Sequence, residues 1–305
     1  MSMRALALGA TLYMPCTRTD LAARLFGPSR IPGLRSVVLC LEDAVLERDL
    51  PLALMNLGGL LRLADSREGC PSDPMIFVRP RDATMLARVL RMPGARRLTG
   101  YVLPKANAET LPSYLALQVP EGQMLMPTLE TREACDPHEM RRLRDQLLAV
   151  QDRILALRIG GNDLMQSMGL RRPPGSTAYD GPLGTVIAML VSTFSPWGFS
   201  LSAPVMERFG DQALLRRELA RDIDHGLFTK TAIHPDQIPI IQTALAVPAD
   251  DVEEARAILD PNGPAVFAQD GVMCEPATHR VWAERLLARA EVFGMATGLP
   301  IHQRA

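Results

Sequence analysis

Short runs of apolar residues recur along the chain at the length of buried β-strands. Most of the gaps between them hold one amphipathic helix. Strands that are apolar on both faces and alternate with helices are typical of a parallel sheet that is covered on both sides. Eight such runs can be marked, over residues 10–16, 36–42, 75–80, 100–105, 124–130, 154–161, 198–205 and 226–233.

The clearest helix follows the fifth run. Asp136 suits the N-cap, Pro137 the first helical position and Glu139 the capping-box position. A second helix, with Asp211 as its N-cap, is predicted before the eighth run. The apolar stripe of the first of these helices repeats at helical spacing through Met140, Leu143, Leu147 and Val150.

Eight β–α units predict an α/β fold of the (β/α)8, or TIM-barrel, type. A doubly wound open sheet is the alternative, but no GxGxxG motif follows the first run. Two more helices are expected after the eighth run, one over DVEEARAIL and one over residues 276–293, ending at Gly294. We therefore predict a catalytic barrel over residues 1–245. Residues 246–305 should form a helical extension that packs on its own barrel or on a neighbour's.

Composition indicates which binding partners and which cellular compartment to expect. The 305 residues are 47% hydrophobic, and 33 basic side chains face 34 acidic ones, so no basic surface is expected to attract nucleic acid. No apolar segment approaches the roughly 20 residues of a membrane span. The five cysteines are scattered and form no CxxC pair. The apolar run at the N-terminus is barely long enough for a signal peptide and continues into the first strand. We expect a cytoplasmic protein without nucleic-acid or membrane partners.

Polar and charged residues follow nearly every run. In a barrel, the carboxyl ends of the strands meet on one face, where catalytic groups are found. Each residue alone could belong to an ordinary polar loop, but the set together predicts one charged site. Its members are Arg18, Glu42, Asp43, Arg79, Lys105, Glu130, Asn162, Asp163 and His234, although His234 is better explained as shaping its loop.

Glu130 and Asp163 are the predicted metal ligands. Two carboxylates without His or Cys partners suit a hard cation such as Mg²⁺, with Mn²⁺ as the other possibility. Arg79 and Lys105 would hold an anionic substrate, Arg79 through its planar fork. Substrate binding is expected from Arg18, Arg79, Lys105, Asn162 and the glycine pair Gly160 and Gly161, since glycines let the backbone come close to a ligand.

The motifs carry a resemblance to a known superfamily. The order of LYMPCTRTD, LEDAV, FVRP, VLPK, TLET, GGNDL, KTAIHPDQI and DGVMCEPATH resembles the citrate lyase β-subunit and HpcH/HpaI aldolase superfamily. The stretches LALRIGGNDLMQSMGLRRP, TKTAIHPDQI and MCEPATHRVWA are similar to one branch of it. That branch is described as C–C bond lyases of the TIM-barrel fold and is linked to tellurium-resistance and stress-response gene clusters. The resemblance spans nearly the whole chain.

This resemblance implies a Mg²⁺-dependent enzyme that cleaves or forms a C–C bond beside a carboxylate, carbonyl or thioester, through an enolate. It implies that Glu130 and Asp163 bind the metal and that Arg79 grips the substrate. Glu42 and Asp43 match the acids of a DLEDAV motif, and Lys105 matches the lysine of LPK. The general base stays open between Glu42, Asp43, a water on the metal and Glu275 of another subunit.

Two departures from the family pattern bear on the substrate. Cys40 stands where the family has the first Asp of DLED, and Glu275 stands where it has an Asp near the C-terminus. In related CoA-ester lyases that acid reaches a neighbouring subunit's site, so a homo-oligomer, a trimer or hexamer, is expected.

Three functions remain open. The first is a lyase for a small oxo- or hydroxy-acid, free or phosphorylated. The second is a CoA-ester lyase of the citryl- or malyl-CoA type. The third is an inactive barrel that binds a ligand or partner.

Overall fold

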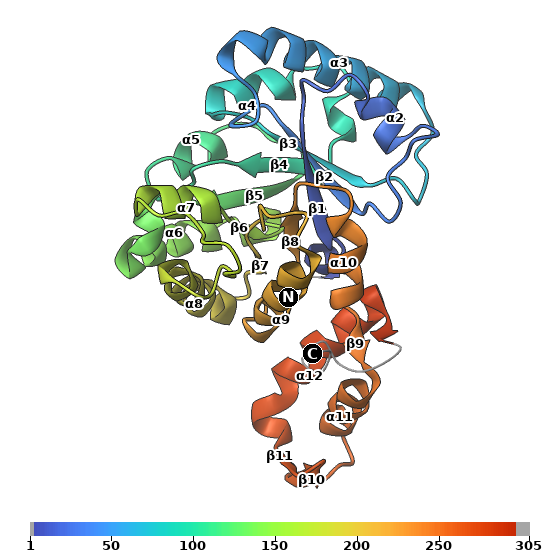
Figure 1. Ribbon diagram of the computed structural model, residues 1–305, viewed down its shortest axis with the longest axis vertical. Coiled ribbons are helices and arrows are strands. Elements are labelled where there is room, and N and C mark those ends of the chain that lie inside the picture. Colours follow the sequence, from blue (N-terminus) through green and yellow to red (C-terminus); the bar gives the residue numbers. More distant parts are fainter. Residues whose placement is uncertain (1–2, 297–305) are drawn as a thin grey trace.

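The barrel is built from eight parallel strands in the computed structural model, which describes residues 3–296 (Figure 1). They follow one another around the sheet in chain order, with β8 beside β1. A bridge between Ala203 and Lys230 joins β7 to β8 and closes the ring. The predicted (β/α)8 barrel is confirmed. The strands are β1 (Ala10–Pro15), β2 (Ser36–Cys40), β3 (Met75–Arg79), β4 (Gly100–Leu103), β5 (Met124–Leu129), β6 (Leu157–Ile159), β7 (Leu201–Ser202) and β8 (Lys230–Ala232).

Helices cover the outside of the ring. The side chain of Asp136 accepts a hydrogen bond from His138 N at 2.7 Å, and that of Asp211 accepts one from Leu214 N at 2.9 Å, so both predicted N-caps are confirmed. Short 3-10 turns join several elements: η1 (Glu47–Asp49), η2 (Ala95–Arg97), η3 (Arg132–Cys135), η4 (Gln151–Arg153) and η5 (Ser195–Trp197). The helices are α1 (Met3–Leu6), α2 (Leu21–Leu25), α3 (Leu50–Ser66), α4 (Ala83–Leu90), α5 (Leu111–Leu115), α6 (Pro137–Leu148), α7 (Gly161–Ser167), α8 (Pro182–Phe194), α9 (Gln212–Asp224) and α10 (Gln237–Ala244).

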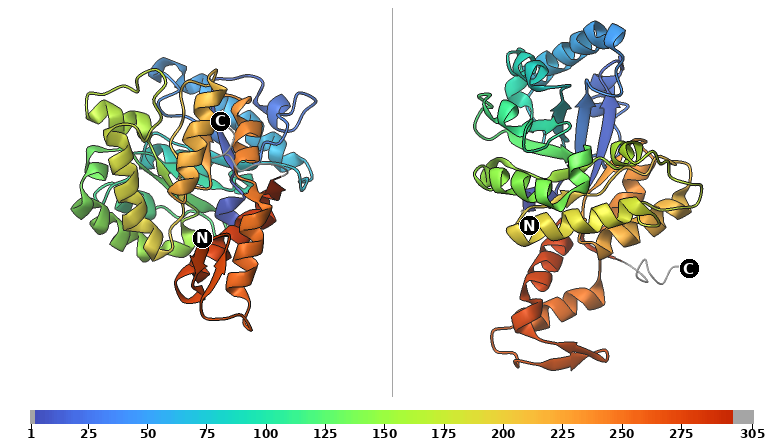
Figure 2. Two further views of the ribbon diagram at one scale, coloured as in Figure 1. Left: turned by 60° about the horizontal axis from the view of Figure 1, so that its bottom comes forward. Right: turned by 90° about the vertical axis from the view of Figure 1, so that its left-hand side faces the viewer.

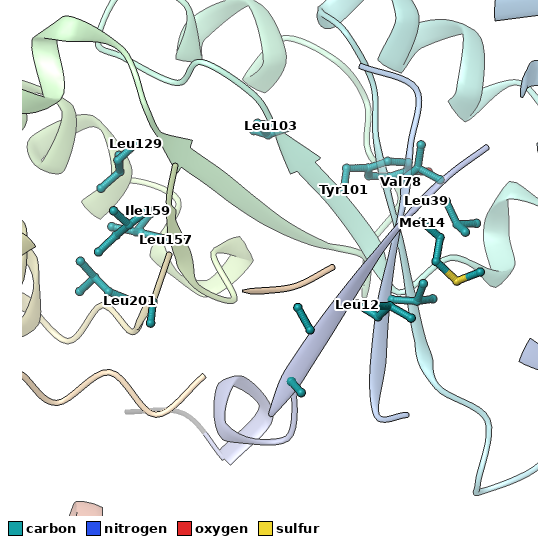
Figure 3. Close-up of a cluster of buried hydrophobic side chains, with 14 of the residues drawn as sticks. Leu12, Met14, Leu39, Val78, Tyr101, Leu103, Leu129, Leu157, Ile159 and Leu201 are labelled. Atoms are coloured by element: carbon teal, nitrogen blue, oxygen red, sulfur yellow. The ribbon is translucent and has the colours of Figure 1, made fainter. Parts of the chain in front are cut away.

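Side chains alternate between the two faces of each strand. The outward residues pack under the helices in one large core (Figure 3). The inward residues at the amino ends of the strands form a second, smaller cluster, which α1 closes from below through Ala5 and the nearby Leu8. The rest of this inner cluster is Val38, Phe77, Val102, Met126, Leu155 and Ala156.

A buried ionic cluster fastens α9 to β8. Lys230 points outward from β8, and its Nζ lies 2.9 Å from Glu218 Oε1 and 2.8 Å from Asp222 Oδ2. On the other side of Glu218, Arg172 Nη1 lies 2.7 Å from Oε2. Two cations therefore balance two acids inside the protein, which is the arrangement that buried charges need.

The segment after α10 builds a small unit of its own. Its two predicted helices are confirmed, and α12 ends at Gly294, whose φ of 77° suits a glycine stop. A hairpin between them was not predicted. The elements are β9 (Val247–Pro248), α11 (Ala249–Leu259), β10 (Phe267–Gln269), β11 (Val272–Cys274), α12 (Pro276–Phe293) and β12 (Met295–Ala296). They share a separate apolar cluster, but the proposed division of the chain after residue 245 stays a prediction.

This unit projects from the end of the barrel opposite to the predicted site (Figures 1 and 2). Arg35, just before β2, donates to the carbonyl of Val292 at 3.1 Å and lies over the ring of Phe293. The carboxyl end of α12 thus meets the amino ends of the strands. Glu275 precedes the other end of α12, about 27 Å away for 18 helical residues. None of the described helices has both the length and the apolar character that crossing a bilayer requires.

Candidate active site

Glu42 is the centre of a charge cluster at the carboxyl ends of β2, β3 and β4. Its side chain is only 4% exposed. Oε1 accepts a hydrogen bond from Lys105 Nζ at 2.6 Å, and Oε2 lies 3.1 Å from Arg79 Nη1. One buried carboxylate therefore joins cations from two neighbouring strands.

Asp43 is held more loosely and titrates differently. It lies 3.7 Å from Arg79 Nη1 and 3.6 Å from Lys105 Nζ, and about half of its side chain is exposed. Partial burial and the adjacent Glu42 raise the pKa of Asp43 to about 6. Burial opposes the ionisation of Glu42, but Asp43, Arg79 and Lys105 outweigh it and lower the pKa of Glu42 overall. Asp43 is thus the carboxyl of the pair that takes up a proton first.

Arg79 is fixed from several sides. Its Nε and Nη2 point at Cys40 Sγ, at 3.4 and 3.2 Å, while Nη1 faces Glu42. The guanidinium also lies 5.3 Å from the centre of the Tyr13 ring. Cys40 occupies the position where the family pattern has an Asp. The sulfur of cysteine is a weak hydrogen-bond acceptor, so residue 40 orients Arg79 through weak contacts.

Glu130 is buried at the end of β5 and is positioned by the backbone of Lys105. The Lys105 N–H donates to Glu130 Oε1 at 2.8 Å. Lys105 adopts a left-handed conformation, with φ of 51°, which is uncommon outside glycine. Thr110 Oγ1 donates to the Lys105 carbonyl at 2.9 Å and helps to hold this turn. Such strained backbone is often found where a functional group must be oriented.

Gly160, just before α7, and Gly161, its first residue, lie so close to neighbouring side chains that a Cβ at either position would clash. A Cβ at Gly160 would overlap Cβ and Oε2 of Glu130. One at Gly161 would lie 2.8 Å from Pro204 Cβ. The pair was predicted to let backbone approach a ligand. The close approach seen at Gly160 is to the side chain of Glu130.

Glu130 and Asp163 both have a raised pKa. Burial, with the nearby charge of Asp163, raises the pKa of Glu130 to about 8, and burial, with Glu42, raises the pKa of Asp163. Neither carboxylate forms an ion pair with any residue between 3 and 296. Two acidic groups that repel each other fit a hard divalent cation. The described residues hold no group of three or more His, Cys, Asp or Glu side chains suited to a metal, so water and substrate would complete the coordination.

Other predicted site residues form no hydrogen bond or ion pair with this cluster in the part of the chain that the structure describes. Arg18 pairs with its neighbour Asp20, at 2.8 Å for Nε–Oδ1 and 2.5 Å for Nη2–Oδ2, and both are exposed. Asn162 is exposed beside Asp163. Glu275 lies on the extension at the other end of the barrel. The residues that direct contacts bring together are Glu42, Asp43, Arg79, Lys105 and Glu130.

Tyr13 and Arg158 were not predicted to belong near the site. The Arg158 guanidinium lies 5.2 Å from the centre of the Tyr13 ring, about as close as that of Arg79. Burial raises the pKa of Tyr13, and the two arginines act against this rise. The arginine within the apolar run LALRIGG was the sequence signal that could have identified Arg158, because arginine is rarely buried in a strand.

A family model described as C–C bond lyase of the TIM-barrel fold matches residues 2–295. The chain belongs to this family. The resemblance noted in the motifs is thereby confirmed, at the level of the C–C bond lyase branch.

Solved structures share the fold of this family member. The protein CitE of Mycobacterium tuberculosis, in complex with magnesium, acetoacetate and coenzyme A, has a TM-score of 0.68 and 23% identity, covering 94% of this chain and 99% of that one. The M. tuberculosis citrate lyase β subunit with oxaloacetate and magnesium has a TM-score of 0.53 and 24% identity over 79% and 97%. RipC of Yersinia pestis has a TM-score of 0.56 and 21% identity over 78% and 95%.

Among characterised relatives, the (3S)-malyl-CoA thioesterase of Cereibacter sphaeroides is 29% identical to this lyase-family chain over 150 residues. The match covers 47% of this chain and 51% of the relative. The chain thus spans about half the length of the curated relative that it matches.

In this C–C bond lyase family member, Gly160→Ala should destabilise the fold by about 1–3 kcal/mol, because the added methyl overlaps Glu130. Urea unfolding measures the change. Gly59→Ala is the matched control. Gly59 lies in α3 with nothing within 4 Å of the added Cβ, so this change should stabilise by up to about 1 kcal/mol. Equal stability of Gly160→Ala and the wild type would show that Glu130 is not confined by Gly160.

Proposed function

We propose that the protein is a Mg²⁺-dependent lyase that makes or breaks a C–C bond beside the carboxylate or carbonyl of a small oxo- or hydroxy-acid. The proposal is carried by a firmly oriented Arg79 near two carboxylates, Glu130 and Asp163, that form no ion pair with the residues described by the structure. Membership of the C–C bond lyase family supports the reaction class. The magnesium complexes of the M. tuberculosis structures with acetoacetate and oxaloacetate support the cofactor and the substrate class.

Glu130 and Asp163 would hold the metal, Mg²⁺ or Mn²⁺. When bound, such an ion acts as a Lewis acid that stabilises the negative charge of an enolate. Lys105 serves this site twice, since its N–H orients Glu130 and its Nζ holds Glu42.

Arg79 would bind the substrate carboxylate or carbonyl. Its Nε and Nη2 contact the thiol of Cys40 and form no ion pair with the described residues, so this edge of the guanidinium could bind an oxyanion. A planar fork suits a carboxylate better than a point charge does. Preorganised cations of this kind supply the largest part of the stabilisation of many transition states.

Asp43 is the best-placed general base of this chain. It is half-exposed, and its pKa of about 6 leaves it mostly ionised at neutral pH yet able to accept a proton. Glu42 is a weaker candidate because its ion pairs with Lys105 and Arg79 stabilise the carboxylate and oppose its protonation. Glu275 could act only in another subunit's site, given its position on the extension.

A CoA-ester lyase is the second candidate. The partial match to a malyl-CoA thioesterase and the coenzyme A complex of the M. tuberculosis protein favour it. Cys40 and Glu275 in place of two family aspartates count against it. Turnover of a panel of 2-oxo- and 2-hydroxy-acids, each offered free and as its CoA ester with Mg²⁺, separates the two. An inactive barrel is disfavoured by the intact set of Arg79, Glu130 and Asp163.

Metal binding should depend on Glu130. Calorimetric titration with Mn²⁺ should show binding to the wild type and its loss in Glu130→Gln, which keeps the size of the side chain but removes the anionic ligand. Glu121→Gln, at an exposed position, is the control and should bind like the wild type. Equal Mn²⁺ binding by Glu130→Gln would remove Glu130 from the metal site.

Arg79→Lys should lower kcat/KM for the substrate found in the panel by about 100- to 1,000-fold, because lysine keeps the charge but loses the fork. Thermal unfolding should change far less, since the charge beside Glu42 remains. A variant that unfolds readily while its folded fraction turns over normally would make Arg79 a structural residue.

We also propose a homo-oligomer, a trimer or hexamer, in which Glu275 closes over a neighbour's site. Apolar side chains near Glu275 are exposed in the single chain, and Val281 is 65% exposed and Trp282 43%. Met273 and Val272 of the hairpin are also exposed. A neighbouring subunit would cover this surface.

Mixed oligomers test this arrangement. Glu275→Ala and Glu130→Ala proteins should each be inactive alone. Co-refolded or co-expressed, they should regain part of the activity, because some sites then combine an intact Glu130 with a partner's intact Glu275. An active monomer at micromolar concentration, shown by light scattering, would contradict the proposal.

A further inference from the structure

A row of polar residues crosses four adjacent strands on one side of the barrel. The strand register pairs Thr128 of β5 with Arg158 of β6, and Arg158 with Ser202 of β7. The bridge between β7 and β8 places Thr229 beside Ser202. All four residues are almost fully buried, between 0% and 4% exposed.

These side chains point into the barrel. Their chain neighbours Leu129, Leu157 and Leu201 point outward into the core beneath the helices (Figure 3). Lys230, next to Thr229, also points outward, to the acids of α9. Because side chains alternate along a strand, the members of the row face the interior.

Each member of the row carries a buried atom with no hydrogen-bond partner in the part of the chain that the structure describes. Other unpartnered atoms are scattered through the protein, but these come from neighbouring strands and face the barrel interior. Buried polar groups are normally satisfied, by protein, water or an ion. The atoms are Thr128 Oγ1, Arg158 Nε, Ser202 Oγ and Thr229 Oγ1.

Arg158 adds a charge that no acid balances nearby. Its Nη2 donates to Thr231 Oγ1 at 2.6 Å, and its Nη1 lies 3.5 Å from Thr11 Oγ1. Among residues 3–296 no carboxylate lies within ion-pair distance of it. Two other buried cations, Lys230 and Arg172, each contact an acid, and buried Arg289 lies over the ring of Phe228. A buried charge without a counter-ion is costly, so the site is incomplete as protein alone.

We propose that this row binds a small monovalent inorganic anion of the halide class, with Arg158 as its counter-charge and the hydroxyls of Thr128, Ser202 and Thr229 as further donors. Hydroxyl and guanidinium N–H groups both donate to anions. The near-complete burial of the row limits the occupant to a small ion. The site lies on the inner wall of the barrel below Glu130, which follows Thr128 by two residues, and its occupancy can be tested without the proposed metal or substrate.

Bromide is the probe for the crystallographic test. Crystals of the wild-type protein grown without halide and soaked in bromide should show an anomalous peak within hydrogen-bond distance of Arg158 Nε. This measurement needs no variant and no substrate, so it is unaffected if the proposed lyase activity is wrong. Absence of a peak in the barrel overturns the proposal.

Thermal unfolding supplies the solution test. Replacing sodium gluconate by sodium bromide at constant ionic strength should raise the wild-type Tm by about 2–5 °C. Arg158→Met should lose this bromide-dependent rise, and Ser202→Ala should weaken it if Arg158→Met does not fold. Arg132→Met, at an exposed position, should respond like the wild type. A crystal peak without any bromide effect on Tm would mean binding at crystal concentration only and would overturn the proposal. The charge of Arg158 would then be offset by Glu130 over a longer distance, without a bound anion.

Discussion

The packing of the Glu130 side chain against the backbone of its two neighbouring strands is the constraint on which the site depends. On one side, Lys105 must adopt a left-handed turn so that its N–H can reach Oε1. On the other, residue 160 must be a glycine, because any Cβ there would overlap the carboxylate. The next residues enter α7, whose first turn carries Asp163. One buried side chain thus sets the relative positions of the ends of β4, β5 and β6, and with them the proposed metal ligands.

The charges at the mouth of the barrel explain why these acids are arranged as they are. Two cations, Arg79 and Lys105, each lie within ion-pair distance of both Glu42 and Asp43. Glu130 and Asp163 form no ion pair with the described residues, and burial together with nearby carboxyl groups raises the pKa of both. Of the four carboxyl groups, only Glu42 has a lowered pKa, while those of Asp43, Glu130 and Asp163 are raised. The balanced pair is suited to proton transfer and substrate binding, and the unbalanced pair to a divalent cation, whose charge would offset theirs.

The barrel could be predicted because each strand is an apolar run of the right length, but finer features depend on information that such runs do not carry. A strand that is apolar on both faces hides which side chains point inward, so Tyr13 and Arg158 could not be placed from spacing. Arg18 forms its ion pair with the nearby Asp20. The position of Arg18 at the end of a strand does not predict this pairing. The hairpin after α11 did have a signal. Asp270 and Gly271 both have positive φ, 48° and 78°, as a tight Asp-Gly turn requires.

The interior of the barrel is apolar under one half of the mouth and polar under the other. The apolar side chains of Val38 and Phe77 lie beneath Glu42 and Arg79. Their low dielectric strengthens the attraction between the charges of that half. Beneath Glu130 lies Thr128, beside the unbalanced guanidinium of Arg158. Arg158 is the buried cation on that side, and no carboxylate among the described residues pairs with it. The two halves of the interior therefore differ in lining, the first being apolar and the second holding polar groups and a buried charge.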